Sequence, residues 1–150
     1  MKKKTNAARI LDRHKVTYEL VEYDYDEGNL SATHLAARNG LPIASIYKTL
    51  VGRGDKTGIF VAVIPGAATL DLKAMAKASG NKKVALTAMK ELLPLTGYIR
   101  GGCSPLGMKK VYPTFLDATI TEHQRIYISA GVRGLKLLLS PTDLQRVTQA

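Results

Sequence analysis

Apolar positions recur with two different periods along this chain. Over Thr5–Lys15 they return every three or four residues, which predicts one face of a helix. The positions on that face are Ala7, Ile10, Leu11 and His14. The same spacing after a Ser, Asp or Thr that can cap a helix predicts further helices. These helices are expected from Ser31 to Asn39, Asp71 to Ser79, Thr87 to Leu93 and Ser140 to about Thr148.

Runs of β-branched and aromatic residues between these helices predict strands. The clearest pair is Ile46–Val51 and Ile59–Ile64, which a glycine-rich segment connects as a hairpin. Because the second strand is apolar on both faces, we expect it in the centre of a sheet. The other expected strands are Val16–Tyr23, Val84–Leu86, Tyr98–Arg100, Val111–Leu116, Ile126–Ser129 and Leu135–Leu139.

The order of the elements predicts the fold class. Strands come in clusters between short helices, without the regular alternation that builds a parallel sheet. We therefore expect an α+β fold, with a mixed, curled or barrel-like sheet surrounded by short helices. No long linker, repeat or low-complexity tract interrupts the pattern, so residues 1–150 are expected to form a single domain.

Composition and charge narrow the class of protein. Hydrophobic residues make up 45% of the chain, too many for a disordered protein, yet no apolar run is long enough to span a membrane. The only cysteine, Cys103, excludes an internal disulfide, which favours a cytoplasmic protein. The formal net charge of +10 favours an anionic partner such as a nucleic acid, although a solvated basic surface is the alternative. Six lysines could form a basic rim: Lys73, Lys77, Lys82, Lys83, Lys109 and Lys110.

Several familiar kinds of site have no motif in this chain. The three histidines lie far apart in the sequence and form no metal-binding pair with one another or with Cys103. Phosphate-binding loops, dinucleotide-binding motifs and the Gly-x-Ser-x-Gly turn of serine hydrolases are also missing. We therefore expect neither a metal nor a cofactor.

The segment Gly101–Gly107 is the strongest local signal for a site. Adjacent glycines allow backbone N–H groups to face a carboxylate, a phosphate or a developing oxyanion, and Ser104 can add a hydroxyl. A tight turn that needs positive φ angles is the alternative. Cys103 within this segment could act as a nucleophile only if a base such as His123 or Lys109 lay nearby. Nothing in the sequence spacing places either residue beside it, so a packed side chain is favoured.

Lys48 stands out among the lysines because of its neighbours. Strand alternation places Ile46, Lys48 and Leu50 on one face. If that face is covered, a lysine there is costly without an anionic partner. The alternative is a lysine that faces solvent, with Tyr47 and Thr49 turned inward.

Several short motifs, taken together, resemble a known family. They are Tyr47-Lys48-Thr49-Leu50, Leu70-Asp71-Leu72-Lys73, Lys82-Lys83-Val84, Thr96-Gly97-Tyr98, Gly101–Gly107 with Lys109-Lys110, and Tyr127-x-Ser129-x-Gly131-x-Arg133-Gly134-Leu135. This set resembles the free-standing aminoacyl-tRNA editing domains of YbaK type and is similar to the Cys-tRNA(Pro) deacylases. The match runs from about Tyr18 to Leu144, nearly the whole chain.

The resemblance implies a mixed, barrel-like sheet wrapped by helices. It also implies hydrolysis of the ester that joins a wrong amino acid to the 3′ end of tRNA(Pro), with Cys-tRNA(Pro) as the expected substrate. In relatives that remove cysteine, the thiol of the substrate attacks its own carbonyl, so that the protein needs no nucleophile. The partners it implies are the aminoacylated tRNA end and, for the choice of tRNA, prolyl-tRNA synthetase.

Site residues follow from the same resemblance. Lys48 would contact the terminal ribose or phosphate, with Thr49 beside it. The N–H groups of Gly101 and Gly102 would face the ester oxygen. Tyr23 and Ser129 would line the amino-acid pocket.

One residue departs from the pattern of the cysteine deacylases. Lys136 stands where they can carry an acid. If that acid holds the amino group of the substrate, a lysine would repel it, and the identity of the removed amino acid is open. A non-catalytic module that binds tRNA or a nucleotide in the same groove is the alternative function.

Overall fold

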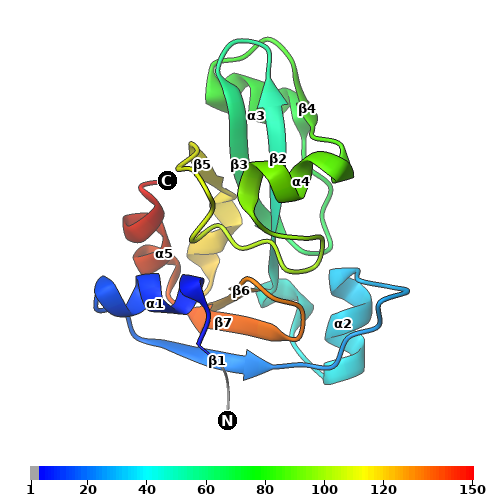
Figure 1. Ribbon diagram of the computed structural model, residues 1–150, viewed down its shortest axis with the longest axis vertical. Helices are drawn as coiled ribbons and strands as arrows, with labels where there is room; N and C mark the ends of the chain where they lie inside the picture. The colour runs from blue at the N-terminus through cyan, green and yellow to red at the C-terminus, as the bar shows by residue number, and fades with distance from the viewer. Residues whose placement is uncertain (1–3) are drawn as a thin grey trace.

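The computed structural model describes residues 4–150. Two sheets form its framework, a three-stranded sheet in the order β1-β7-β6 and a four-stranded sheet in the order β4-β2-β3-β5. Figure 1 shows the long hairpin of β2 and β3 standing above the smaller sheet. The strands are β1 Tyr18–Glu22, β2 Tyr47–Gly54, β3 Gly58–Pro65, β4 Val84–Leu86, β5 Thr114–Leu116, β6 Ile126–Ser129 and β7 Leu135–Leu139.

Short helices surround the sheets. They are α1 Asn6–Arg13, α2 Ala32–Asn39, α3 Leu72–Ser79, α4 Met89–Thr96 and α5 Pro141–Thr148, with 3-10 turns η1 Ile43–Ser45 and η2 Ala118–Glu122. Thr5, Ser31, Asp71 and Ser140 cap helices as predicted, each accepting a hydrogen bond from a first-turn N–H. Within the described residues, none of these helices is long and apolar enough to cross a bilayer.

Strand pairing confirms the α+β class and the mixed sheet. β7 lies between β1 and β6 and is antiparallel to both, whereas β3 pairs antiparallel with β2 and parallel with β5. β3 is therefore a central strand, as its apolar sequence predicted. A parallel bridge between Ile46 and Tyr127 joins the two sheets. The two sheets do not close into a barrel.

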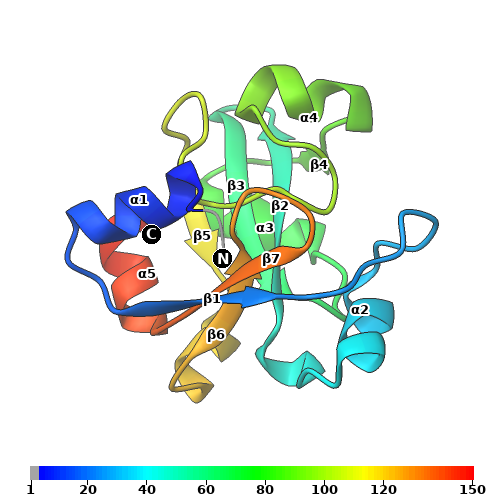
Figure 2. The same ribbon diagram turned by 60° about the horizontal axis from the view of Figure 1, so that its bottom comes forward.

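The largest core lies on one face of the three-stranded sheet. Ile126, Ile128, Leu137 and Leu139 are completely buried there against α1 and α5. Figure 2 shows β1 crossing the front of the molecule, with α1 and α5 on one side and α2 on the other. Burying each of these side chains contributes about 1.5–3 kcal/mol, so this core is the main source of stability.

Two smaller apolar clusters cover the opposite face of the joined sheets. One packs under α2 and contains Tyr23, Leu35, Ala36 and Ile46. The other packs under α3 and contains Phe60, Ala62, Ile64 and Met75. The hairpin strands are thus covered on both faces.

The segment after β4 differs from its prediction. Thr87 does not cap a helix, because its N–H and its hydroxyl both donate to the carbonyl of Val51 and extend the strand pairing. Helix α4 starts at Met89 and continues past Pro94 to Thr96, whose hydroxyl donates to the carbonyl of Leu92 at 2.7 Å. A proline removes one N–H donor, and the last turn of this helix forms without it.

Two expected strands are also different. Tyr98–Arg100 is not a strand, because Gly97 leaves the helix with a φ of 85° and directs the chain into a turn. The strand expected from Val111 begins only at Thr114. The carbonyl of Pro113 accepts the N–H of Val61 at 2.9 Å, but Pro113 has no N–H to donate. Val111 is 99% exposed and lies outside the sheet.

Candidate active site

The glycine loop Gly101–Gly107 packs closely against the turn between β6 and β7. A Cβ atom on Gly102 would lie 3.2 Å from the Cα of Val132, so only glycine allows this approach without displacement. The Nε of Arg133 donates to the carbonyl of Arg100 at 2.8 Å and fixes the start of the loop. Gly101 has a φ of 84° and lies between Arg133 and Leu30. Arg133 belongs to a motif of the resemblance, but its hydrogen bond to the loop was not expected from the sequence.

Backbone donors in this loop differ from those that the resemblance suggested. The N–H of Gly102 donates to the carbonyl of Ile99 at 2.9 Å, so it is already used within the turn. Within residues 4–150, the N–H groups of Gly101, Cys103 and Ser104 have no hydrogen-bond acceptor. Because unpaired backbone donors are uncommon in folded proteins, these three are the candidates to bind an oxygen of a ligand.

Two side chains of the loop are structural. The hydroxyl of Ser104 is completely buried and accepts the N–H of Leu106 at 3.3 Å, so it is used within the loop, and its contact with substrate stays a prediction. Burial raises the pKa of the Cys103 thiol to about 12, an effect that the side chain of Thr96 only partly opposes. A thiol that stays protonated at neutral pH is a poor nucleophile, which agrees with a packed role for Cys103.

Lys48 shares a face of β2 with Ile46 and Leu50, and Tyr47 and Thr49 are turned inward, as the alternative had it. Tyr47 points into the main core, which leaves Lys48 on the opposite face with Ile46 and Leu50. The amine of Lys48 is half-buried and makes no ion pair or hydrogen bond within the described part of the chain. Loss of water lowers its pKa. An amine in this state favours an anion from outside the protein.

The side chain of Thr49 does not share a face of β2 with the side chain of Lys48. It pairs with Val63 of β3, whose side chain is in the main core, so the Thr49 side chain points to the other face of the sheet. Its hydroxyl oxygen is enclosed and has no hydrogen-bond partner within residues 4–150. The Thr49 side chain therefore cannot bind a ligand that Lys48 holds on its own face.

Tyr23 and Ser129 come together around Lys136. Ser129 of β6 pairs with Lys136 of β7, and the amine of Lys136 lies 5.1 Å from the centre of the Tyr23 ring. The Ser129 hydroxyl accepts the N–H of Gly131 at 3.1 Å. The parallel bridge between Ile46 and Tyr127 stands two residues before Lys48 and Ser129, and within residues 4–150 these two strands pair no further. Three of the predicted site residues and Lys136 thus share one face of the joined sheets.

Two hollows of the surface lie away from this face. One follows β1 from Asp12 to Glu22. The other, of about 230 Å³, lies between α1, α5 and residues 105–112. Neither is lined by Lys48, Ser129 or Lys136, so these hollows do not mark the candidate site.

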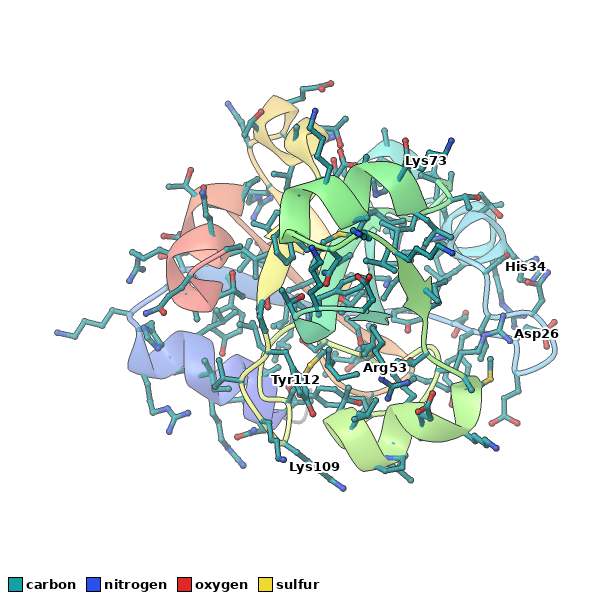
Figure 3. All side chains as sticks on the ribbon, turned by 90° about the horizontal axis from the view of Figure 1, so that it is seen from above. Asp26, His34, Arg53, Lys73, Lys109 and Tyr112 are labelled. Atoms are coloured by element: carbon teal, nitrogen blue, oxygen red, sulfur yellow. The ribbon has the colours of Figure 1, made fainter. Side chains whose placement is uncertain are left out.

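Outlying charged side chains do not join the site. Figure 3 shows Lys73 and Lys109 on opposite sides of the molecule, so the six lysines do not form one rim. His34 and Asp26 lie together at another edge of that view, with 3.9 Å between Nε2 and Oδ2. Among residues 4–150, no cluster of three or more His, Cys, Asp or Glu side chains could hold a metal ion.

Comparison with known proteins shows which family the chain belongs to. Residues 26–147 match the family described as the aminoacyl-tRNA editing domain. The chain belongs to this family. Its similarity to EbsC of Enterococcus faecalis, named as a candidate Cys-tRNA(Pro)/Cys-tRNA(Cys) deacylase, is 50% identity over 97% of this chain and 88% of that protein.

Solved structures agree on the fold of the editing domain. One, described as the hypothetical protein APE2540, superposes with a TM-score of 0.87 and 25% identity over 97% of this chain and 95% of its own. A second, described as a candidate trans-editing enzyme for prolyl-tRNA synthetase, gives a TM-score of 0.80 and 24% identity over 99% of this chain and 95% of its own. The predicted resemblance is confirmed, and the protein is an aminoacyl-tRNA deacylase that acts on tRNA.

Proposed function

We propose that this editing domain removes cysteine from mischarged tRNA(Pro), with Lys48 holding the tRNA end and the glycine loop polarising the ester. The observation that carries the proposal is the half-buried amine of Lys48, which has no protein partner within residues 4–150 and shares its face with Tyr23 and Ser129. A phosphate of the tRNA end supplies the missing anion, and the neighbouring ribose lies within reach of the same amine.

Loop N–H groups would donate hydrogen bonds to the oxygen of the ester carbonyl that is attacked. As the ester carbonyl becomes tetrahedral, negative charge develops on its oxygen, and fixed backbone donors stabilise that charge. Gly101 is the exposed donor among the three that lack an acceptor. One such donor accounts for about 10²–10³ in rate, which is a useful share of the barrier for an ester that is already labile.

Cysteine as the substrate is supported by the name of EbsC, the relative at 50% identity. The side chain of a cysteinyl ester can attack its own carbonyl, so that the protein need not supply a nucleophile. The Cys103 thiol, whose pKa is raised to about 12, agrees with this division of labour. The groups that this chain contributes are an anion receptor at Lys48 and an oxyanion site at the loop.

Partners and location follow from the substrate. The formal charge of +10 suits a tRNA, whose phosphates bind basic proteins in a salt-dependent way. For the choice of tRNA, we propose transient association with prolyl-tRNA synthetase, in line with the trans-editing description of the structure at a TM-score of 0.80. The expected compartment is the cytoplasm, where aminoacyl-tRNA is made, and residues 1–150 would act as one editing domain.

A deacylation assay tests the proposal. Purified protein is mixed with Cys-tRNA(Pro) and, separately, with Ala-tRNA(Pro), and release of the amino acid is followed over time. We expect rapid release of cysteine by the wild type and a loss of about 10²-fold or more in kcat/KM for Lys48→Ala. Lys73→Ala, which removes an exposed lysine on α3, is the matched control and should keep wild-type activity.

The alternative function gives the opposite result. A non-catalytic tRNA-binding module would slow the spontaneous loss of cysteine, because it shields the ester from water. Protection of the ester by the wild type, or full activity in Lys48→Ala, would overturn the proposal. Circular dichroism and a urea unfolding curve for each variant separate a lost contact from a lost fold.

A further inference from the structure

Lys136 is a buried lysine with no acidic partner. Its relative exposure is 7%, on the central strand of the three-stranded sheet. No ion pair or hydrogen bond to its amine occurs within residues 4–150, and its one close contact is the face of the Tyr23 ring. Lysines are almost never fully buried unless they are paired, so this arrangement needs an explanation.

Strand alternation places this amine on the site face. Leu135, Leu137 and Leu139 of β7 point into the main core, so Lys136 points the other way. It pairs with Ser129 on one side and with Val21 on the other. Lys48 follows the bridge from Ile46 to Tyr127 of β6, and Lys136 lies on β7, so β6 separates the strands that carry the two lysines.

Two amines at this separation suit the two ends of an aminoacyl ester. If Lys48 holds the phosphate end, the amino-acid side chain extends toward Ser129, Tyr23 and the amine beyond them. A neutral amino-acid side chain without an acidic proton gains no ion pair or proton transfer from an amine at that point. A side chain with an acidic proton does, because the amine can accept that proton and pair with the anion that remains.

We propose that Lys136 is a catalytic residue that accepts the thiol proton of a bound cysteinyl ester and thereby selects cysteine over neutral amino acids. The inference rests on the proposed function, since it assigns the acid–base group of that same site. It also gives a role to the one residue that departs from the pattern of the cysteine deacylases.

The steps balance as follows. The thiol proton passes to the neutral Lys136 amine, and the sulfur forms a bond to the carbonyl carbon while the oxygen takes up negative charge at the glycine loop. The bond from carbon to the ribose oxygen then breaks, and that oxygen receives the proton back from the Lys136 ammonium. The products are tRNA with a free 3′ hydroxyl and a cyclic thioester of cysteine, which water then hydrolyses.

Electrostatics around Lys136 agree with this role. Burial lowers the pKa of its amine to about 8, close to the usual thiol value of about 8.5, so the proton can move in either direction near neutral pH. The pKa of Tyr23 is raised by burial, which keeps that phenol neutral. Glu19 of β1 is paired with Arg125 at 3.2 Å, and Arg133 in the β6–β7 turn is the other cation acting on Tyr23.

Two substitutions of Lys136 test the proposal. Lys136→Met keeps the length and removes the amine, and we expect a loss of about 10²-fold in kcat/KM for Cys-tRNA(Pro) with little change for Ala-tRNA(Pro). The rising limb of the pH–rate profile for cysteine should also move to higher pH. Lys136→Arg keeps the charge but cannot accept a proton at neutral pH, so it should recover only part of the loss.

Leu138→Met is the matched control, because Leu138 has the same 7% exposure on the same face of β7. It should keep wild-type rates on both substrates. If Lys136→Met does not fold, the activity of Lys136→Arg and a binding measurement test the role of Lys136 instead. The probe is a cysteinyl-amide analogue of the 3′ adenosine, whose thiol pKa, read by thiolate absorbance, should fall on binding to the wild type.

Failure of this inference is distinct from failure of the proposed function. If the wild type releases no amino acid, the proposed function is wrong. If the wild type releases cysteine and Lys136→Met is within threefold of it, or loses equal factors on both substrates, only the role of Lys136 is wrong. An unchanged thiol pKa in the bound analogue would also overturn that role.

Discussion

The two faces of the three-stranded sheet differ in what they bury. One face presents mainly apolar side chains to α1 and α5, and several of them are completely enclosed. The other face presents Tyr23, Ser129 and Lys136, with Lys48 on the adjoining strand. An apolar face contributes free energy of folding, whereas a buried lysine without a carboxylate costs it. The contrast teaches that this small sheet stabilises the protein with one face, whereas the other face carries the residues that we propose bind the ligand.

The largest effect is expected on the apolar face. Leu137→Ala removes a completely buried side chain from the main core and should lower the free energy of unfolding by about 2–5 kcal/mol. Urea unfolding measures this loss. Leu93→Ala, at a leucine that is 52% exposed on α4, is the control and should change stability by less than about 0.5 kcal/mol. Equal losses in the two variants would contradict the assignment of the main core.

A smaller effect is expected from pH on the site face. Burial lowers the Lys136 pKa from 10.5 to about 8, so the unfolded chain holds that proton up to higher pH than the folded chain. Between these values unfolding takes up a proton, and the folded state becomes more stable as pH rises. Below the pKa of the folded state the amine is protonated in both states, and the folded protein is destabilised by the full cost of burying that charge.

The difference in unfolding free energy between wild type and Lys136→Met isolates this contribution, because other groups titrate alike in both. When the pH is raised from about 7.5 to about 9.5, the free energy of unfolding of the wild type should increase relative to that of Lys136→Met. Urea midpoints at the two pH values give the comparison. Parallel pH curves for the two proteins would show that the amine is not desolvated.

The smallest effect is expected at the thiol of the glycine loop. Cys103→Ala removes a group that burial keeps protonated, with a pKa of about 12, so kcat/KM for Cys-tRNA(Pro) should stay within about twofold. A modest loss of stability, of about 1 kcal/mol, is expected from the lost packing. A fall of 10²-fold or more in activity with an unchanged urea midpoint would make Cys103 part of the chemistry and place the reacting bond at the loop thiol.

Helix starts and the hairpin were predictable because their causes are local. The hydroxyl of Ser31 and the carboxylate of Asp71 each accept a hydrogen bond from the N–H three residues later in the chain. Such caps can be predicted because a capping residue directly precedes the apolar spacing of a helix. Alternation likewise indicated that Ile46, Lys48 and Leu50 share a face, but the buried Tyr47 of the structure was needed to decide between the two alternatives for that face. Errors occurred where a distant contact decided the outcome, as at Thr87, whose N–H and hydroxyl bond to Val51.

Site residues divide along the same line. The order of residues alone determined that a glycine loop, a Tyr-Lys-Thr-Leu strand and a late Ser129 occur in one chain, and these motifs were enough for the family. Only the tertiary structure decided that the N–H of Gly102 is occupied, that Thr49 faces the core, and that Lys136 lies against Tyr23. The contact of Lys136 with Tyr23 joins segments more than a hundred residues apart, and the loss of water at this amine depends on that packing, which no local pattern encodes. The bond of Gly102 and the pairing of Thr49 are closer in the chain, but they depend on a turn and a strand register that spacing alone does not fix.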